Sequence, residues 1–539
     1  MHRQHQVITM KPSWPIVLIV TLPLVVTLAL AVVLWWLVLS PVQTTADLSV
    51  PADDYPAGSA INWQPWGDGA FARARAERQG MLLYFHAQWC SWCRQYQNDS
   101  LEHPRSVSVI NNHYVPLLVD VDQRRDLFTR FGGRGLPYTV LLDADAELTA
   151  RFTGSLSATD LHTVLAARAS HTAMSTTLST PEQTLPGASA RIDNPEAFLQ
   201  FLYEAYDSDA QRLSGTAQLG TLSKRPQPIT YRLLLQLDDW RERMPGMLDV
   251  LRADLYDERD GGFFFYRDEA QADPAAQIET AKVLGLNAQM IWLYADAVAQ
   301  LNRERDREVV RGALDYVRGT LWDKTRGAFW GSQFSDPEYY QGDAADRTAP
   351  RVDRTQFADS SGQMIVAIIR AAQVLNQPVW LEWAGRALAG LDTRLAQADG
   401  SYFHFRGIDG APQLSGYLPA QVWPAVAWWA YYEASGEAHA ARRGAQLISH
   451  IARYENAELG GFSERLYSDL EPWAEPRTHG ALAWLLHGPA RAAQLADDIL
   501  PYVQRARWHE LTRAQLQLQN ASDPDDVALG MQVRILRGQ

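Results

Sequence analysis

A short motif recurs four times in the second half of the chain, between long helical stretches. Each copy has an acidic or polar turn, then glycine, then aromatic residues. The copies read DERDGGFFFY from Asp257, DKTRGAFWGS from Asp323, QADGSYFHFR from Gln397 and NAELGGFSER from Asn456. One phenylalanine per copy marks the spacing, which is 59 to 74 residues: Phe263, Phe329, Phe403 and Phe462. A period of this length fits one helical hairpin plus its loop, repeated along the chain.

The repeat predicts an all-helical domain over residues 191–515, followed by a C-terminal tail over 516–539. In each copy we expect the glycine to end a helix and the aromatic residues to start an extended loop that packs on the next hairpin. Hairpins stacked in a closed ring form an α/α toroid, whose inner helices surround a cavity. An open solenoid is the alternative, and both arrangements fit the spacing.

Residues 14–39 are almost entirely apolar and carry no charge. A helix of about 20 apolar residues spans the roughly 30 Å hydrocarbon layer, whereas the apolar region of a secretory signal is shorter. Arg3 and Lys11 precede the stretch, and three aspartates follow it. By the positive-inside rule, residues 1–13 face the cytoplasm. We predict an uncleaved, single-pass anchor in the inner (cytoplasmic) membrane, a spacer over 40–60, and the bulk of the protein in a periplasmic or other extracytoplasmic space.

Residues 61–168 alternate between strand-like and helix-like patterns. Short apolar runs such as MLLYFHA from Met81 and YVPLLVD from Tyr114 are typical of buried strands, and RDLFTRFGG from Arg125 is typical of a helix closed by glycine. This alternation predicts an α/β domain with a central sheet and helices on its faces. A Ser/Thr/Pro-rich linker over 169–190 separates it from the helical domain.

Cys90 and Cys93 are the only cysteines in 539 residues. A zinc site needs four ligands, usually two such pairs or cysteines with histidines at fixed spacing, and no second pair exists. An inert pair of buried thiols is a further alternative. The spacing favours a dithiol that exchanges disulfides, with no metal and no separate cofactor.

The position of the pair supports this interpretation. Cys90 is expected at a helix N-terminus, where free N–H groups and the helix dipole stabilise a thiolate. Cys93 lies one turn later and could resolve a mixed disulfide by intramolecular attack. Pro137 directly precedes a predicted strand, where a cis proline could present backbone groups beside the sulfurs to an incoming peptide. We therefore predict that Trp89, Leu136 and Pro137 form the substrate-binding surface.

The residues Trp89, Cys90, Cys93 and Pro137 resemble those of the thioredoxin superfamily. Over residues 61 to 490, the chain resembles the spermatogenesis-associated thioredoxin-like family, in which a thioredoxin-like domain is fused to a six-hairpin α/α toroid of the glycosidase-like type. Its motifs WCSWC, YVPLLVD, SKRPQP, GGFFFY, NAQMIWLYADA, ADSSGQM and GGFSE follow the order of that family. The thioredoxin-like part also resembles the periplasmic domain of transmembrane disulfide-shuttling proteins.

The sequence departs from these families at several polar positions. Thioredoxins commonly carry a buried aspartate six residues before the first cysteine, where this chain has Tyr84; Tyr84 or His86 could substitute only in part for its proton handling. The family's toroid usually has His-Arg-Tyr after Gly-Gly-Phe, where Phe264 and Phe265 replace the first two. Its His-Phe-Glu-Lys element reads Glu-Thr-Ala-Lys from residue 279 here. The resemblance therefore implies that the cavity chemistry is altered or absent.

Toroids of this class host glycosidases, lyases and sugar epimerases that use acidic residues at the inner rim, although fold alone does not fix function. A glycosidase needs two carboxylates about 5–10 Å apart, a separation that sequence does not give. Each acidic candidate could equally be a loop acid or a helix cap. The candidates are Glu279, Asp353, Asp359 and Glu464.

The function predicted from sequence is a membrane-anchored, extracytoplasmic thiol–disulfide oxidoreductase whose toroid recruits a substrate or partner. Its partners would be protein thiols and disulfides, the lipid bilayer through residues 14–39, and a membrane protein that acts as electron donor or oxidant. The net charge of −13 and the lack of a Lys/Arg block argue against nucleic acid. The alternatives are a carbohydrate-active toroid enzyme with an accessory thioredoxin-like domain, and a non-catalytic scaffold.

Overall fold

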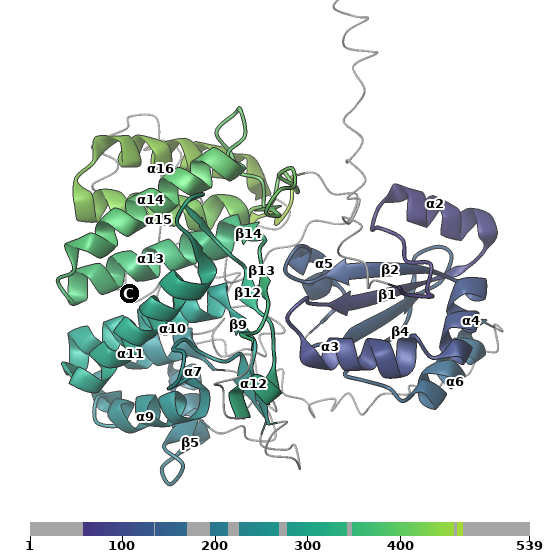
Figure 1. The fold of residues 1–539 in the computed structure, drawn as a ribbon, viewed down its shortest axis with the longest axis horizontal. Helices are drawn as coiled ribbons and strands as arrows, with labels where there is room; N and C mark the ends of the chain where they lie inside the picture. Colours follow the sequence, from purple (N-terminus) through teal and green to yellow (C-terminus); the bar gives the residue numbers. More distant parts are fainter. Residues whose placement is uncertain are drawn as a thin grey trace, which may run out of the picture.

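The structure is a computed structural model that contains an α/β domain followed by a helical domain, and the two lie against each other (Figure 1). It describes residues 58–133, 135–169, 195–213, 226–268, 277–341, 348–456 and 461–466. The predicted anchor 14–39, its cytoplasmic flank 1–13, most of the linkers 40–60 and 169–190, and the tail 516–539 lie outside these residues. Within the described ranges, no helix combines the length and the apolar character needed to cross a membrane.

The described sheet of the α/β domain has the strand order β2-β1-β3-β4. β1 (Gly80–His86) pairs in parallel with β2 (Tyr114–Asp120) and antiparallel with β3 (Tyr138–Leu142), and β3 pairs antiparallel with β4 (Leu148–Thr153). The residues of β1 and β2 are almost all buried. This burial explains their continuous apolar sequence, because helices cover both faces of the sheet.

The helices around this sheet confirm the predicted alternation. η2 continues α3 as a π-helical turn and leads to α4, which packs beside α6. The helices are α2 (Asp68–Glu77), α3 (Ser91–Tyr96), η2 (Gln97–Leu101), α4 (Pro104–His113), α5 (Arg125–Arg130) and α6 (Ala158–Ala169). The domain is thioredoxin-like, as the resemblance implied. Its fold places the turn between β1 and α3 at the end of the sheet where β1 ends and β3 begins.

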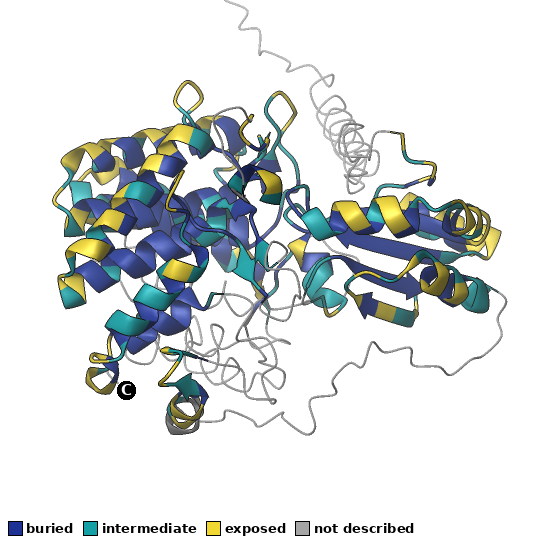
Figure 2. Cartoon of the chain, turned by 60° about the horizontal axis from the view of Figure 1, so that its bottom comes forward, coloured by how far each residue is buried: buried dark blue, intermediate teal, exposed yellow. Residues whose placement is uncertain are grey.

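The helical domain begins with α7 (Pro195–Ala205), after which the described residues form four successive pairs of helices, of which the last three pack closely as hairpins. Each pairs an inner helix, buried on most sides, with an outer helix that exposes one face (Figure 2). The inner helices are α8 (Pro228–Leu234), α10 (Leu284–Leu301), α13 (Ala358–Val374) and α15 (Pro419–Ser435). The outer helices are α9 (Met244–Leu255), α11 (Glu304–Tyr316), α14 (Pro378–Leu395) and α16 (Ala438–Ile451).

The inner helices α10, α13 and α15 pack side by side in chain order, which confirms the predicted hairpin repeat. Residues 467–515, which would complete the predicted toroid, lie outside the described part of the chain. Short turns of helix lie in the connections: η3 (Asp238–Trp240) joins α8 to α9, and the others follow an outer helix, namely η5 (Val317–Leu321), α12 (Pro337–Gln341) and η7 (Ala452–Tyr454).

Two-residue strands complete the connections at the hairpin ends. In the first half of the domain these are β5 (Tyr206–Asp207), β6 (Arg212–Leu213), β7 (Tyr266–Arg267), β8 (Ile278–Glu279), β9 (Lys282–Val283), β10 (Trp322–Asp323), β11 (Ala328–Phe329) and β12 (Ser332–Gln333). In the second half they are β13 (Val352–Asp353), β14 (Gln356–Phe357), β15 (Phe405–Arg406), β16 (Glu455–Asn456) and β17 (Gly461–Phe462).

In its first three copies the glycine–aromatic motif folds as a tight turn that follows an outer helix; residues 457–460 of the fourth copy lie outside the described residues. The residue just before the turn pairs with the first aromatic residue after it: Tyr256 with Phe263, Trp322 with Phe329, Ala396 with Tyr402, and Glu455 with Phe462. The third copy is one residue shorter, so Tyr402 and not Phe403 takes the paired position. In the first three copies the glycine lies within the turn, which corrects the expectation that it would end a helix.

In the first three copies the turn packs on the next outer helix and so links successive hairpins. Gly327 has a φ of +62° and lies against α14, where a Cβ atom on it would come within 2.9 Å of the carbonyl oxygen of Arg386. A Cβ atom on Gly390 of α14 would in turn overlap the backbone of Gly327. The turn of the first copy approaches Gly312 of α11 in the same manner. The glycines are therefore needed for close contact between neighbouring hairpins.

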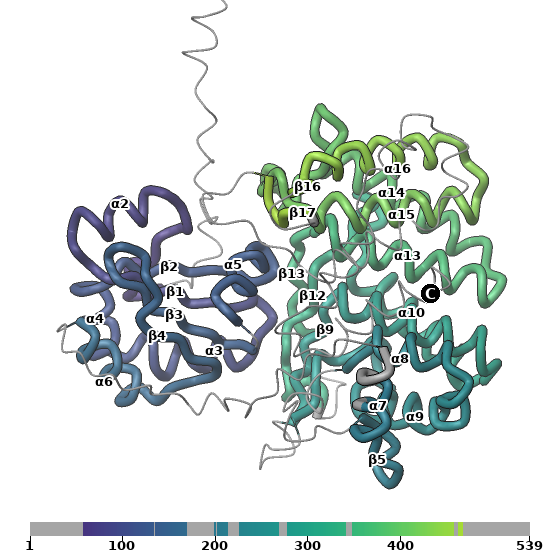
Figure 3. Tube along the Cα trace, turned by 180° about the vertical axis from the view of Figure 1, so that it is seen from behind, coloured from purple at the N-terminus to yellow at the C-terminus, as the bar shows by residue number. Residues whose placement is uncertain are grey.

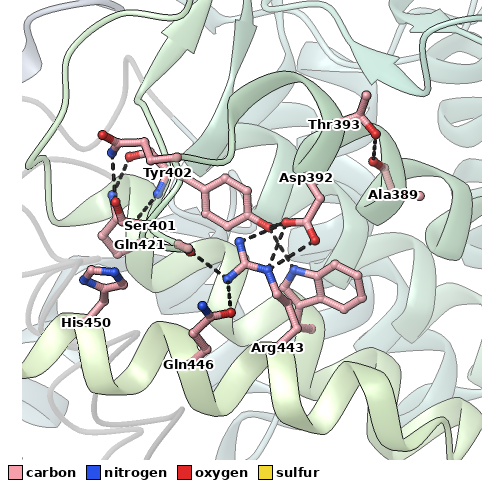
Figure 4. A network of polar contacts seen from close by, with 12 residues as sticks. Ala389, Asp392, Thr393, Ser401, Tyr402, Gln421, Arg443, Gln446 and His450 are labelled. Carbon is pink, nitrogen blue, oxygen red and sulfur yellow. Dashed lines mark hydrogen bonds and ion pairs between the residues drawn. The ribbon is translucent and has the colours of Figure 1, made fainter.

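A polar network fixes the third copy (Figure 4). The hydroxyl of Tyr402 bonds Asp392 of α14, and Arg443 of α16 pairs with the same carboxylate at 2.9 Å. The indole N–H of Trp428 donates to the Tyr402 hydroxyl at 3.0 Å, and Gln421 accepts from the Tyr402 backbone N–H at 2.8 Å. This network holds the segment that carries His404, two residues further on.

Candidate functional site

Cys90 and Cys93 lie where β1 gives way to α3, as the sequence predicted. Cys90 is the N-cap of α3, and its sulfur accepts a hydrogen bond of 3.1 Å from the backbone N–H of Cys93. The two residues are joined by a disulfide, with Cα atoms 5.3 Å apart, and each is only 2% exposed. In the reduced form, the same N–H group would stabilise a Cys90 thiolate, which is the species that attacks a disulfide.

The Leu136–Pro137 peptide bond is cis. Tyr138, the first residue of β3, pairs with Phe85 near the end of β1. The turn to Cys90 follows β1 directly. This register therefore places Leu136 and Pro137, which precede β3, at the same end of the sheet as the disulfide.

Tyr84 and His86, the two candidates for proton handling, are both buried in β1. The Tyr84 hydroxyl donates to the carbonyl oxygen of Cys93 at 2.9 Å, and burial raises its pKa well above the ordinary range. Burial lowers the pKa of His86 to about 4, so its imidazole is neutral at physiological pH.

The helical domain covers the end of the α/β domain where the turn between β1 and α3 carries the disulfide. Seen from both sides, α3 and α5 face the loop strands β9, β12 and β13 (Figures 1 and 3). The ring centroids of Trp89 and Phe265 are 4.4 Å apart. The backbone N–H of Ser335 donates to the Trp89 carbonyl oxygen at 3.2 Å. The Ser91 hydroxyl donates to Glu279 at 2.6 Å, so a residue between the two cysteines bonds the helical domain directly.

A second group of contacts surrounds Asp122, which follows β2. The Trp89 indole N–H donates to its carboxylate at 2.8 Å, and the His404 ring nitrogen Nε2 lies 3.0 Å from its carbonyl oxygen. Burial raises the pKa of Asp122 to about 6; nearby Asp359 adds to this, while the bond from Trp89 and the charge of Arg125 oppose it. Trp89, next to the disulfide, is thus held by Asp122 of its own domain and by Phe265 and Ser335 of the helical domain.

An ion pair completes the contact. Arg465 lies 3.5 Å from the carboxylate of Asp126, which also pairs with Arg124 at 2.8 Å. Burial alone would raise the pKa of Asp126, but the two arginines lower it overall. The helical domain therefore adds a second cation to a buried carboxylate of the α/β domain.

The structure brings Glu279, Asp359 and Glu464 to the side of the helical domain that faces the α/β domain. Glu279 bonds Ser91, and Asp359, in the first turn of α13, lies 3.8 Å from His404 Nδ1. Glu464 is buried next to Arg465, and its carbonyl oxygen accepts from Leu418. Asp353 accepts from the backbone N–H of Thr355 at 3.0 Å, which is a local turn.

Several residues of this contact were missed by sequence reasoning: Ser91, Asp122, Phe265, His404 and Arg465. The repeat contained a usable signal, because Phe265, His404 and Glu464 each follow the paired aromatic residue of their motif copy by two positions. Aligning the copies on that residue would have placed all three at the same end of the hairpins. Among the described residues, no three His, Cys, Asp or Glu side chains gather closely enough to hold a metal ion.

The α/β domain also matches known proteins. The model of the family Thioredox_DsbH, described as "Protein of unknown function, DUF255", matches residues 55–136, which include both cysteines. Uncharacterized protein B0495.5 of Caenorhabditis elegans is 30% identical over 97 residues, which cover 16% of this chain and 13% of that protein. Spermatogenesis-associated protein 20 of Rattus norvegicus is 28% identical over 71 residues, which cover 13% and 9%. The matched segment thus spans about a tenth of these relatives.

Among solved structures, the chain is similar to the crystal structure of D-mannose isomerase, with a TM-score of 0.46 and 14% sequence identity. The alignment covers 63% of this chain and 88% of that one.

Proposed function

We propose that the protein is a thiol–disulfide oxidoreductase in which Cys90 attacks and Cys93 resolves. The observation that carries this proposal is the Cys90–Cys93 disulfide at the start of α3, with the Cys93 N–H directed at the Cys90 sulfur at 3.1 Å. The thioredoxin-like fold around the pair supports it. Leu136 and Pro137, which we propose contact a peptide substrate, lie at the same end of the sheet as the disulfide, because Tyr138 pairs with Phe85.

In the reducing direction, the Cys90 thiolate attacks one sulfur of a substrate disulfide. A bond forms between Cys90 and that sulfur, and the other substrate sulfur leaves as a thiolate that takes a proton from solvent. Cys93 then loses its proton and attacks the Cys90 sulfur, which restores the Cys90–Cys93 disulfide and releases the second substrate thiol. The substrate gains two electrons and the protein loses two, so a dithiol donor must reduce the protein again.

We further propose that residues 14–39 anchor the chain in a membrane and that both domains lie outside the cytoplasm. The donor or oxidant would then be another membrane protein with its own dithiol. The uncharged sequence of this segment and the basic residues before it support the proposal.

The helical domain would govern what reaches the disulfide. Its contacts with Trp89 and Ser91 support this role. A carbohydrate-active centre would need two rim carboxylates facing a shared opening. Glu279, one of the four acidic candidates, instead bonds Ser91 of the α/β domain.

Trapping of a mixed disulfide tests the proposed function. A Cys93→Ser variant, reduced and then mixed with insulin, should accumulate an insulin adduct through Cys90, detected on a non-reducing gel and located by mass spectrometry. The Cys90→Ser variant should form no adduct. If the Cys93→Ser variant forms none either, or if both variants form it equally, the assignment of Cys90 as nucleophile is wrong.

A further inference from the structure

The contact between the domains closes the route by which a protein substrate would reach the disulfide. Ala281 of the helical domain is fully buried in the same apolar cluster as Cys90 and Cys93, and Phe265 and Phe334 pack against that cluster. Exchange with a protein disulfide therefore requires the helical domain to move away from this face.

Glu279 is a carboxylate built into the closed contact. It is 2% exposed, and its Oε2 atom accepts the hydrogen bond from Ser91, the residue that directly follows Cys90. Burial raises its pKa, while bonds from Ser335 and Ser91 and the charge of Arg94 act in the opposite direction. Arg94, on α3, is the cation that faces Glu279, and its guanidinium also donates to the Ser335 carbonyl oxygen at 2.9 Å.

The two redox states of the cysteine pair differ in charge. The disulfide is neutral, whereas reduction and loss of one proton leave a thiolate at Cys90. That thiolate would form on the residue directly before Ser91, whose hydroxyl bonds Glu279, and both Cys90 and Glu279 are only 2% exposed. Like charges repel more strongly where water is excluded. The closed contact should therefore accommodate the disulfide better than the thiolate.

We propose that Glu279 couples the docking of the helical domain to the redox state of the cysteine pair, so that the domain covers the disulfide and separates from the thiolate. Glu279 is then a positioning residue, because it acts through the closed contact and not on a substrate. The inference rests on the proposed function and adds its regulation. By linkage, a contact that favours the oxidised form also makes that form harder to reduce.

The redox step can be followed with dithiothreitol as the two-electron donor. One of its thiolates attacks the Cys90–Cys93 bond, and its second sulfur closes the cyclic disulfide. Cys93 leaves as a thiol, and Cys90 remains as a thiolate in equilibrium with its protonated form. The reduced fraction at each ratio of dithiothreitol to its cyclic disulfide is measured by alkylation and mass spectrometry.

The comparison uses full-length wild type and Glu279→Gln, which keeps an acceptor for Ser91 but removes the charge. We expect Glu279→Gln to be half-reduced at a ratio about fivefold lower than wild type, or lower still. Ser91→Ala, which removes the hydrogen bond but keeps the carboxylate, and Glu382→Gln on the exposed face of α14 should stay within about twofold of wild type. Equal ratios for wild type and Glu279→Gln, or an equal shift in Ser91→Ala, would overturn the proposal.

Hydrogen exchange of wild type alone provides a test that does not depend on the folding of a variant. On reduction, amide protection around residues 89–94 and 278–283 should fall, because the domains separate. Unchanged protection in wild type would contradict the coupling while leaving the proposed function intact. A wild-type disulfide that no dithiol reduces would instead refute the proposed function itself.

Discussion

The indole ring of Trp89 packs against the phenyl ring of Phe265 at 4.4 Å, although the two residues belong to different domains. Trp89 immediately precedes the disulfide, and Phe265 lies two positions beyond the paired aromatic residue of the first motif copy. The pair is therefore a direct link between the repeat of the helical domain and the redox pair.

Removing one ring of this pair should make the disulfide more accessible. An aromatic pair contributes about 0.5–1.5 kcal/mol beyond its buried area, which corresponds to roughly a two- to tenfold change in an opening equilibrium. We expect Phe265→Ala to be reduced by a phosphine about two- to tenfold faster than wild type. Phe403→Ala, at the corresponding hairpin end but without a ring contact to Trp89, is the matched control. Equal rates for Phe265→Ala and wild type would show that this pair does not hold the contact closed.

A buried ion pair supports the first motif copy. Lys282 is fully buried, and its ammonium group lies 2.5 Å from Asp257 and 2.7 Å from the carbonyl oxygen of Gly261. Replacing one partner leaves the other charge buried and unpaired, which typically destabilises by about 3–5 kcal/mol. Lys282→Met should lose that much in urea unfolding, whereas the Lys282→Met/Asp257→Asn double variant should lose less. Lys324→Met, at an exposed position, is the control. If Lys282→Met lowers the free energy of unfolding no more than Lys324→Met does, the buried ion pair does not support the first motif copy.

The approach of Gly390 to Gly327 predicts a steric limit between the second motif copy and α14. A Cβ atom on Gly390 would overlap the Gly327 backbone, and overpacking of this kind typically costs about 1–3 kcal/mol. We expect Gly390→Ala to lower the free energy of unfolding by that amount. Gly319→Ala, where a Cβ atom would meet open space, should change it little. Equal stability of Gly390→Ala and Gly319→Ala would mean that the contact between turn and helix is loose.

Because His86 is buried in its neutral form, we expect the free energy of unfolding of the α/β domain to fall at acidic pH. Its pKa is about 4 in the folded protein and near 6.5 when unfolded, so the unfolded chain binds more protons between these two values. Stability contributed by neutral His86 is complete above pH 6.5 and is lost as the pH falls toward 4, by about 3 kcal/mol. In His86→Phe, urea unfolding at pH 7 and pH 4.5 should differ less than in wild type. The same difference in both proteins would exclude His86 as the source.

Local patterns were sufficient to predict much of the fold. The apolar runs around Tyr84 and Leu117 predicted the two parallel strands β1 and β2, and the junction after the first of them placed Cys90 at a helix start. The motif spacing predicted the hairpins. Its third copy was misaligned at Phe403 because that turn is one residue shorter, which spacing alone did not reveal.

The covering of the disulfide could not be predicted in this way. Ser91 and Glu279 are 188 residues apart, and their contact depends on how two domains dock rather than on any local period. The departures from the resembling family are partly explained by this docking, because Phe265 packs on Trp89 and Ala281 fits in the apolar cluster around the cysteines. Residues that looked like losses of polar chemistry in the sequence therefore serve the contact between domains.

Catalysed reduction of insulin by dithiothreitol tests the central claim most directly. Full-length wild type should accelerate the precipitation of reduced insulin over the uncatalysed reaction, and Cys90→Ser, which lacks the attacking sulfur, should not. If wild type and Cys90→Ser give the same rate, the Cys90–Cys93 pair is not a centre for thiol–disulfide exchange with proteins.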